Sequence, residues 1–137
     1  MEGSLIPHRT FHRWLFAIAG VYNIAWGIVT AIDPQWLFRF AHMPLANYPQ
    51  IFACLGMVIG VYGLLYWTVA FAPEHGWQII AVGLLGKILG AIGLASLIAG
   101  GTWPPRTIVL CIPNDLIWLL PFAVYLRDVR LYRRSLT

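Results

Sequence analysis

Four long apolar runs constrain this chain more than any other feature of its sequence. They cover approximately residues 14–32, 51–71, 77–99 and 107–126. Each is about 20 residues long, the length that an α-helix needs to cross the hydrocarbon core of a bilayer. Of the 137 residues only 10% are charged, whereas a soluble domain carries roughly a quarter. The sequence therefore predicts an all-α fold, a single integral membrane domain built as a four-helix transmembrane bundle.

Arginines are distributed unevenly between the two sides of the predicted bundle. Four spans place both tails on one side, and these tails hold Arg9, Arg13, Arg127, Arg130, Arg133 and Arg134. The loops on the opposite side hold Arg39 and Arg106. Because cytoplasmic segments are enriched in basic residues, we expect a multi-pass protein of the cell inner membrane with both termini in the cytoplasm. The lipid bilayer is thus the predicted partner, and no basic stripe indicates nucleic acid.

Small residues predict which helix faces turn inward. At about 100° per residue, one side of the third run carries Gly83, Gly86, Lys87, Gly90 and Gly93. The corresponding stripes are Gly56, Gly60 and Gly63 in the second run, and Gly20, Asn23, Gly27 and Thr30 in the first. Small residues at this spacing let helix backbones approach closely, so we expect all three stripes to be packing surfaces.

Polar side chains interrupt three of the runs at a similar depth. By helical rise, Asn23, Lys87 and Asp115 lie about 14–18 Å from the predicted cytoplasmic ends of their spans. Lys87 is the only lysine, and a lone charge is costly in a membrane, so we expect it to form an ion pair with Asp115. Asn114 and Trp118 share the arc of Asp115. We predict a polar centre of these five residues, which is either a structural pair that fixes helix register or a binding site.

Pro113 directly precedes the polar residues of the fourth run. A proline removes a backbone donor and frees a carbonyl one turn earlier, here that of Val109. A freed carbonyl within a membrane must find a partner in protein or water. We expect Pro113 to begin a fresh helical segment with Asn114 and Asp115 in its first turn.

Cysteine and histidine provide no evident reactive set. Cys54 and Cys111 are predicted to point in different directions, as two separate buried thiols. His8 and His12 lie one turn apart with no acidic neighbour in sequence, so we expect them at the membrane interface and predict no metal site. No catalytic nucleophile–base set is evident, which favours a protein that is not an enzyme. No cofactor is evident, although the polar centre is compatible with a bound quinone or lipid.

Four segments together resemble a family of small, uncharacterised four-span bacterial membrane proteins. They are residues 22–27 (YNIAWG), 60–63 (GVYG), 83–87 (GLLGK) and 114–122 (NDLIWLLPF). Members sometimes carry the label "alkyl hydroperoxide reductase", which this sequence contradicts because it has no thioredoxin-like pattern. The layout is also distantly similar to DoxX-like proteins, some of which are small subunits of quinone-linked oxidoreductases. The resemblance implies the four-span fold and no particular activity.

The sequence leaves three functions open. The first is an accessory or binding module that holds a lipid, a quinone or a partner subunit at the polar centre. The second is a proton-linked transporter or carrier, because acidic and basic residues at mid-depth are what a proton relay uses. Four short helices are few for a transport pathway, so this function favours a homo-oligomer. The third is a subunit of a membrane redox enzyme, which requires Cys111 or a bound quinone. The lack of a legible catalytic set favours the first.

Overall fold

The computed structural model describes residues 5–136, and within them the regular structure is entirely helical. Three long helices are continuous, namely α1 (Arg9–Ile32), α3 (Pro49–Phe71) and α4 (Trp77–Ala99). The fourth span is assembled from η1 (Pro105–Thr107), α5 (Ile108–Cys111), the π turn η2 (Ile112–Leu116) and α6 (Ile117–Arg134). A short helix, α2 (Trp36–Phe40), lies between α1 and α3. Within this part of the chain four helices are long and apolar enough to cross a bilayer, so the protein is an all-α, multi-pass membrane protein, as predicted.

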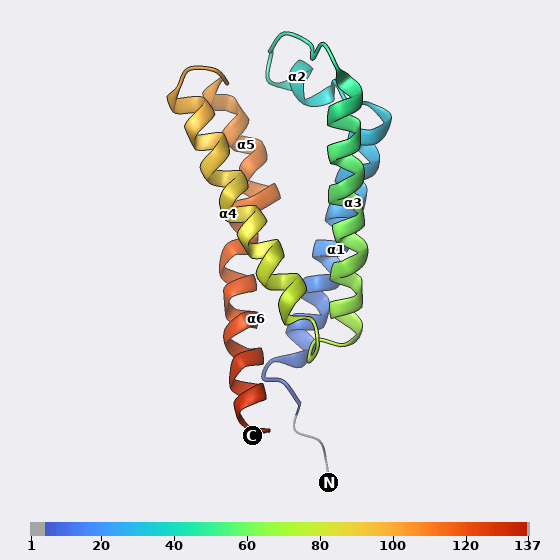
Figure 1. Cartoon of the computed structure of the whole chain (residues 1–137), viewed down its shortest axis with the longest axis vertical. Coiled ribbons are helices and arrows are strands. Elements are labelled where there is room, and N and C mark those ends of the chain that lie inside the picture. Colours follow the sequence, from blue (N-terminus) through green and yellow to red (C-terminus); the bar gives the residue numbers. More distant parts are fainter. Residues whose placement is uncertain (1–4, 137) are drawn as a thin grey trace.

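The four spans form two helix pairs that meet at one end and diverge toward the other (Figure 1). In the first pair α1 packs along α3, and in the second α4 packs against η2 and α6. The end where the pairs meet carries both ends of the chain, and we call it the termini end. The opposite, distal end carries α2 and the turn after α4. Large apolar side chains such as Val61, Ile92 and Leu120 are exposed, as expected for surfaces that contact lipid tails.

Glycines let α1 and α3 pack with their backbones almost in contact. A Cβ atom added to Gly27 would lie 2.6 Å from the carbonyl oxygen of Gly56 and 2.7 Å from Cα of Gly60. One added to Gly63 would lie 2.6 Å from the carbonyl oxygen of Gly20. Real Cβ atoms do not approach backbone atoms this closely, so these positions require glycine. The stripes predicted on the first two spans are confirmed as the surfaces that join them.

The same prediction for α4 is wrong. A Cβ atom added to Gly86 or Gly93 would have no neighbour within 4 Å, and one added to Gly90 would lie 3.4 Å from the carboxylate of Asp115. Gly83 alone of this stripe is crowded, against the ring and hydroxyl of Tyr66. Most of the stripe therefore borders open space, because the two pairs diverge along this part of α4 instead of packing backbone to backbone.

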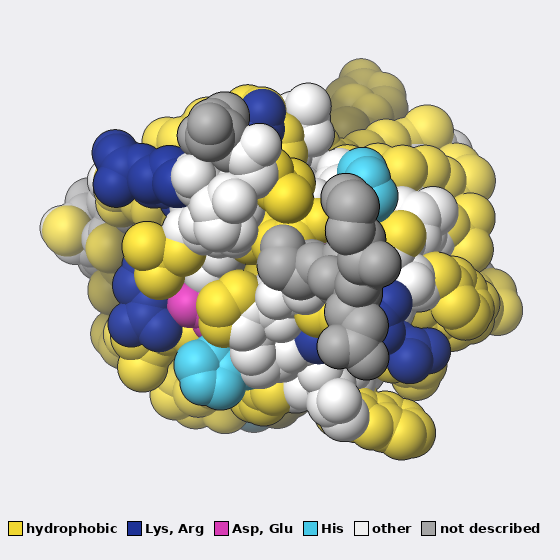
Figure 2. Space-filling view, turned by 90° about the horizontal axis from the view of Figure 1, so that it is seen from below, with side chains coloured by type: hydrophobic (Ala, Val, Ile, Leu, Met, Phe, Trp, Pro, Cys, Tyr) yellow, Lys and Arg dark blue, Asp and Glu magenta, His cyan; other side chains and the backbone are white. Residues whose placement is uncertain are grey.

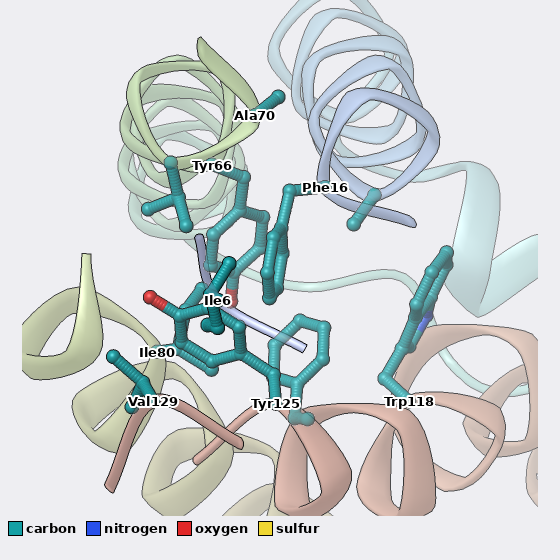
Figure 3. Packing of buried hydrophobic residues seen from close by; sticks show 11 residues of the cluster. Ile6, Phe16, Tyr66, Ala70, Ile80, Trp118, Tyr125 and Val129 are labelled. Atoms are coloured by element: carbon teal, nitrogen blue, oxygen red, sulfur yellow. The ribbon is translucent and has the colours of Figure 1, made fainter. Parts of the chain in front are cut away.

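A cluster of aromatic side chains joins the two pairs at the termini end (Figure 3). Phe16 of α1 contacts Tyr66, Phe122 and Tyr125, with ring centroids 4.7–6.5 Å apart. These side chains are fully or almost fully buried, and aromatic residues contribute a large apolar area each. The Tyr125 hydroxyl also donates to the carbonyl of Pro73 at 2.7 Å, which ties α6 to the turn between α3 and α4. This end of the molecule is therefore its packed core.

The first and last spans extend further at the termini end than their apolar runs predict. Helix α1 begins at Arg9 rather than near Trp14, and α6 continues to Arg134 rather than ending near residue 126. The additional turns are polar, so a hydropathy criterion misses them. Side-chain contacts hold them, as in the 2.7 Å bond that Arg9 Nε donates to Glu74.

Candidate binding site

The polar centre is built around the π turn η2, which contains Pro113. Because Pro113 has no backbone N–H, the regular α-helical ladder cannot run through it, and the chain widens over Ile112–Leu116. The carbonyl of Pro113 accepts a 2.8 Å bond from Trp118 Nε1. The carbonyl of Asn114 accepts a 2.5 Å bond from Lys87 Nζ. A new helical segment thus begins at Ile112, next to Pro113, with Asp115 in its first turn, as predicted, but it is a π turn whose carbonyls bond to side chains.

Lys87 and Asp115 do not form the direct ion pair that their depth predicts. None of the ion pairs within residues 5–136 joins them at 4.0 Å or less. Lys87 is buried, and its ammonium group bonds to the Asn114 carbonyl and lies 5.8 Å from the centre of the Trp118 ring. The reason is the π turn, which places the Asn114 carbonyl oxygen within hydrogen-bonding distance of the Lys87 ammonium group. The ammonium and the carboxylate still attract each other through space.

Asp115 is held by weak contacts from its own segment. Cys111 Sγ lies 3.7 Å from one carboxylate oxygen, and Asn114 Nδ2 lies 3.3 Å from both. These distances are long for hydrogen bonds to a carboxylate. Because a carboxylate has about four acceptor positions, Asp115 retains the capacity to bond another group.

Two adjoining cavities meet at this carboxylate. The central cavity, about 500 Å³, has a lining that includes Asn23, Tyr62, Tyr66, Gly86, Lys87 and Asp115. The distal cavity, about 350 Å³, has a lining that includes Trp26, Leu37, Phe52, Gly93, Trp103 and Cys111. Both are lined by Leu55, Ile59, Gly90, Asn114 and Asp115. Apolar cavities of this size with a few convergent polar groups are typical of small-molecule sites.

Asn23 is the polar residue of the central cavity with the clearest unmet demand. It is 5% exposed, and its amide makes no hydrogen bond with any residue of the described range 5–136. Tyr62 and Tyr66 line the same cavity, and their hydroxyl groups also form no hydrogen bond within that range. A buried polar group of this kind calls for a partner outside the protein, either a ligand or water.

The structure brings four of the five predicted residues to one cavity. Asn23, Lys87, Asn114 and Asp115 line it, whereas Trp118 is buried in the core against Tyr22 and Phe122. The cavity offers hydrogen-bond donors, because a lysine has three N–H groups and Lys87 uses one on the Asn114 carbonyl. It also offers acceptors on Asp115 and both kinds of group on Asn23. The arrangement can therefore bind an oxygen-bearing head group.

The surroundings of the cavities differ at the two ends. Toward the termini end, Phe16, Tyr66 and Phe122 fill the space between the helix pairs (Figure 3 shows Phe16 and Tyr66). At the distal end, Phe38 of α2 meets Trp103 edge to face, with ring centroids 6.3 Å apart. The polar centre is therefore sealed by packed aromatic side chains on one side.

A second polar cluster lies at the termini end, where none was predicted. His12 and Asp128 are both fully buried, with His12 Nε2 3.0 Å from Asp128 Oδ2. His12 is thus packed inside the protein at this end, with an acidic partner that is remote in sequence. Asp128 follows Tyr125 by three residues, so extending the inward arc of the fourth run past residue 126 would have placed it inside.

Comparison with known proteins does not identify a family for this chain. No family model, curated protein or solved structure matches the chain. The resemblance to the four-span bacterial family therefore stays a prediction.

Proposed function

We propose that this protein is a non-catalytic membrane module that binds an amphipathic molecule of the lipid phase, a lipid or a quinone, at the polar centre. The observation that carries the proposal is Asn23, a buried amide without a partner on a cavity of about 500 Å³. The oxygen-bearing head group bonds to Asn23, Lys87 and Asp115. Its apolar part lies along the glycine stripe of α4, where Gly86 faces unfilled space.

Packing and cysteine placement favour binding over the two rival functions. A proton-linked carrier needs a polar path to both surfaces, but tightly packed aromatic side chains such as Phe16 and Phe122 occupy the termini side of the centre. A redox enzyme subunit that uses its own thiols needs them together, but Cys54 is exposed, Cys111 is buried and both are free.

Ligand binding should appear as thermal stabilisation of the full-length protein in mild detergent. A molecule that binds the folded state alone stabilises it by about 2.7 kcal/mol at 100 times its Kd. We expect this from a short-chain quinone or from a phospholipid, each titrated separately while the melting temperature is recorded. Asn23→Leu should abolish most of that stabilisation. Without ligand the variant should be no less stable than the wild type, because it removes an unpartnered buried amide.

A matched control is Cys54→Ala, which changes an exposed side chain on α3. This variant should leave both the melting temperature and the ligand response unchanged. A response to quinone alone identifies a quinone site, and a response to phospholipid alone identifies a lipid site. If neither stabilises the wild type, or if Asn23→Leu responds fully, the proposed site is wrong. Copurification of a second membrane protein with an unresponsive chain would favour a partner subunit instead.

We also propose that the protein resides in the cell inner membrane with its termini end in the cytoplasm. Figure 2 supports this orientation, because it shows Lys and Arg side chains at several places around that end. A topology reporter fused after Thr137 should be active only in the cytoplasm. One inserted near Ala46, in the loop after α2, should be active only outside. A C-terminal fusion that is active outside would reverse the proposed orientation.

A further inference from the structure

Three side chains that ligate metals converge at the termini end, away from the polar centre. His8 Nδ1 lies 2.9 Å and His12 Nε2 3.0 Å from the same atom, Asp128 Oδ2. The three ligand atoms all lie within 4.8 Å of one another. The histidines come from the start of α1 and the aspartate from α6, so the cluster links the two helix pairs.

Burial distinguishes this cluster from a chance meeting of surface side chains. The side chains of His12 and Asp128 are 0% and 1% exposed, whereas that of His8 is 63% exposed. Two ligands are thus fixed by the core, and the third is reached from water. A metal ion held by all three would present its remaining coordination positions on the side of the exposed His8 ring.

The backbone of His8 gives an independent indication. Its φ of 53° and ψ of 32° place it in the left-handed region, just before the first residue of α1. Residues other than glycine rarely adopt this conformation, and it persists where the surroundings hold it. In this conformation the His8 ring reaches Asp128. The start of the helix is therefore shaped around the cluster.

We propose that His8, His12 and Asp128 form a binding site for a divalent transition-metal ion. Two imidazoles and one carboxylate are a ligand set that zinc uses with water in its fourth position, and one that Fe²⁺ also uses. Around tetrahedral zinc with bonds of 2.0–2.1 Å, ligand atoms lie roughly 3.3 Å apart. A small movement of the exposed His8 ring closes the set to that spacing. Binding displaces the protons that now lie between the imidazoles and the carboxylate.

The surroundings of the cluster leave one carboxylate oxygen available to a metal ion and favour reversible binding. Arg127 donates to the other carboxylate oxygen of Asp128, at 2.9 and 3.1 Å, and leaves Oδ2 to the metal. When His12 Nε2 binds the metal, its ring proton moves to Nδ1, which is buried and has no hydrogen-bond partner within residues 5–136. Most histidine ligands donate that proton to an acceptor that strengthens the bond. Without this support, and with one ligand exposed, the ion exchanges with solution.

The test uses the full-length protein in detergent after treatment with a chelator. Titration with Zn²⁺, followed by isothermal calorimetry and native mass spectrometry, should show about one ion bound per chain, and chelator should remove it. His8→Ala changes an exposed side chain, so the variant folds. Losing one of three ligands should weaken zinc binding by at least the roughly 10–100-fold that the loss of an outer-shell partner costs. Cobalt should report the same site by its absorption spectrum.

The control is His75→Ala, which removes an exposed histidine from the turn between α3 and α4 at the same end of the molecule. It should bind zinc as the wild type does. If the wild type binds no zinc, or if His8→Ala binds it as tightly as the wild type, the three residues are a hydrogen-bond network and the proposal is wrong. Equal losses in the two variants would likewise indicate scattered surface binding and overturn the site.

Discussion

The free energy of unfolding should fall by about 1–3 kcal/mol when Gly27 is replaced by alanine. The added methyl group would overlap the backbone of α3 at Gly56 and Gly60, and backbone atoms cannot move aside as a flexible side chain can. The two helices must therefore separate along part of their length. The measurement is thermal or denaturant unfolding of the purified protein in one detergent, with the helical signal followed by circular dichroism.

Gly93→Ala is the matched control for this substitution. It makes the same chemical change in another membrane span, at a position where an added Cβ atom has no neighbour within 4 Å. Alanine also has a higher helix propensity than glycine, by about 0.8–1.0 kcal/mol. The control should be as stable as the wild type or more stable. Equal losses at Gly27 and Gly93 would show that the close approach of α1 and α3 is not what the glycines provide.

Lys87→Met should cost about 3 kcal/mol, which makes it one of the most damaging substitutions within the membrane spans. A hydrogen bond to a charged group contributes about 1.5–3 kcal/mol. The variant loses the hydrogen bond to the Asn114 carbonyl and leaves Asp115 without its neighbouring cation. Methionine fills a volume similar to that of the lysine stem, so the loss reports the charge and the hydrogen bond and not a cavity. The measurement is the free energy of unfolding in detergent.

The double variant Lys87→Met with Asp115→Leu separates the contribution of the charges from that of the hydrogen bond to the Asn114 carbonyl. It removes both charges, but the Asn114 carbonyl still lacks its donor, which costs about 1–3 kcal/mol. We therefore expect partial recovery of the stability that Lys87→Met loses. Full recovery would contradict the importance of the carbonyl contact. Strictly additive losses would show that the two charges do not interact.

The four spans could be predicted from the sequence because hydropathy over 20 residues depends little on tertiary contacts. The limits of α3 and α4 agree closely with the apolar runs, for turns and prolines end those runs on both sides. The polar turns that extend α1 and α6 could not be predicted in this way. They are stabilised by partners far along the chain, as when Arg9 bonds to Glu74, and such pairing is not visible in a single sequence.

The candidate site was partly predictable for a related reason. Helical periodicity and depth are local properties, and they placed Asn23, Lys87 and Asp115 on inward faces at a similar level. The partner of Lys87 depends on how the backbone passes Pro113, and side-chain patterns do not determine whether a helix breaks or widens there. The role of the α4 glycines, such as Gly86, depends on whether the helix pairs run together or diverge. The arrangement of the helix pairs depends in turn on the aromatic packing at the termini end, which a single sequence does not reveal.

Because this packing joins the two helix pairs at the termini end, a small rotation there moves the distal end of the molecule by a larger distance. Helix α4 has 23 residues and is about 35 Å long, so a rotation of about 5° at the aromatic cluster would displace its far end by about 3 Å. Such a displacement is enough to make or break the edge-to-face contact of Phe38 with Trp103. Substitutions at Phe16 or Tyr125 would thus change the position of the distal end of α4. They would alter the access of a ligand to the polar centre without changing the groups that bind the ligand.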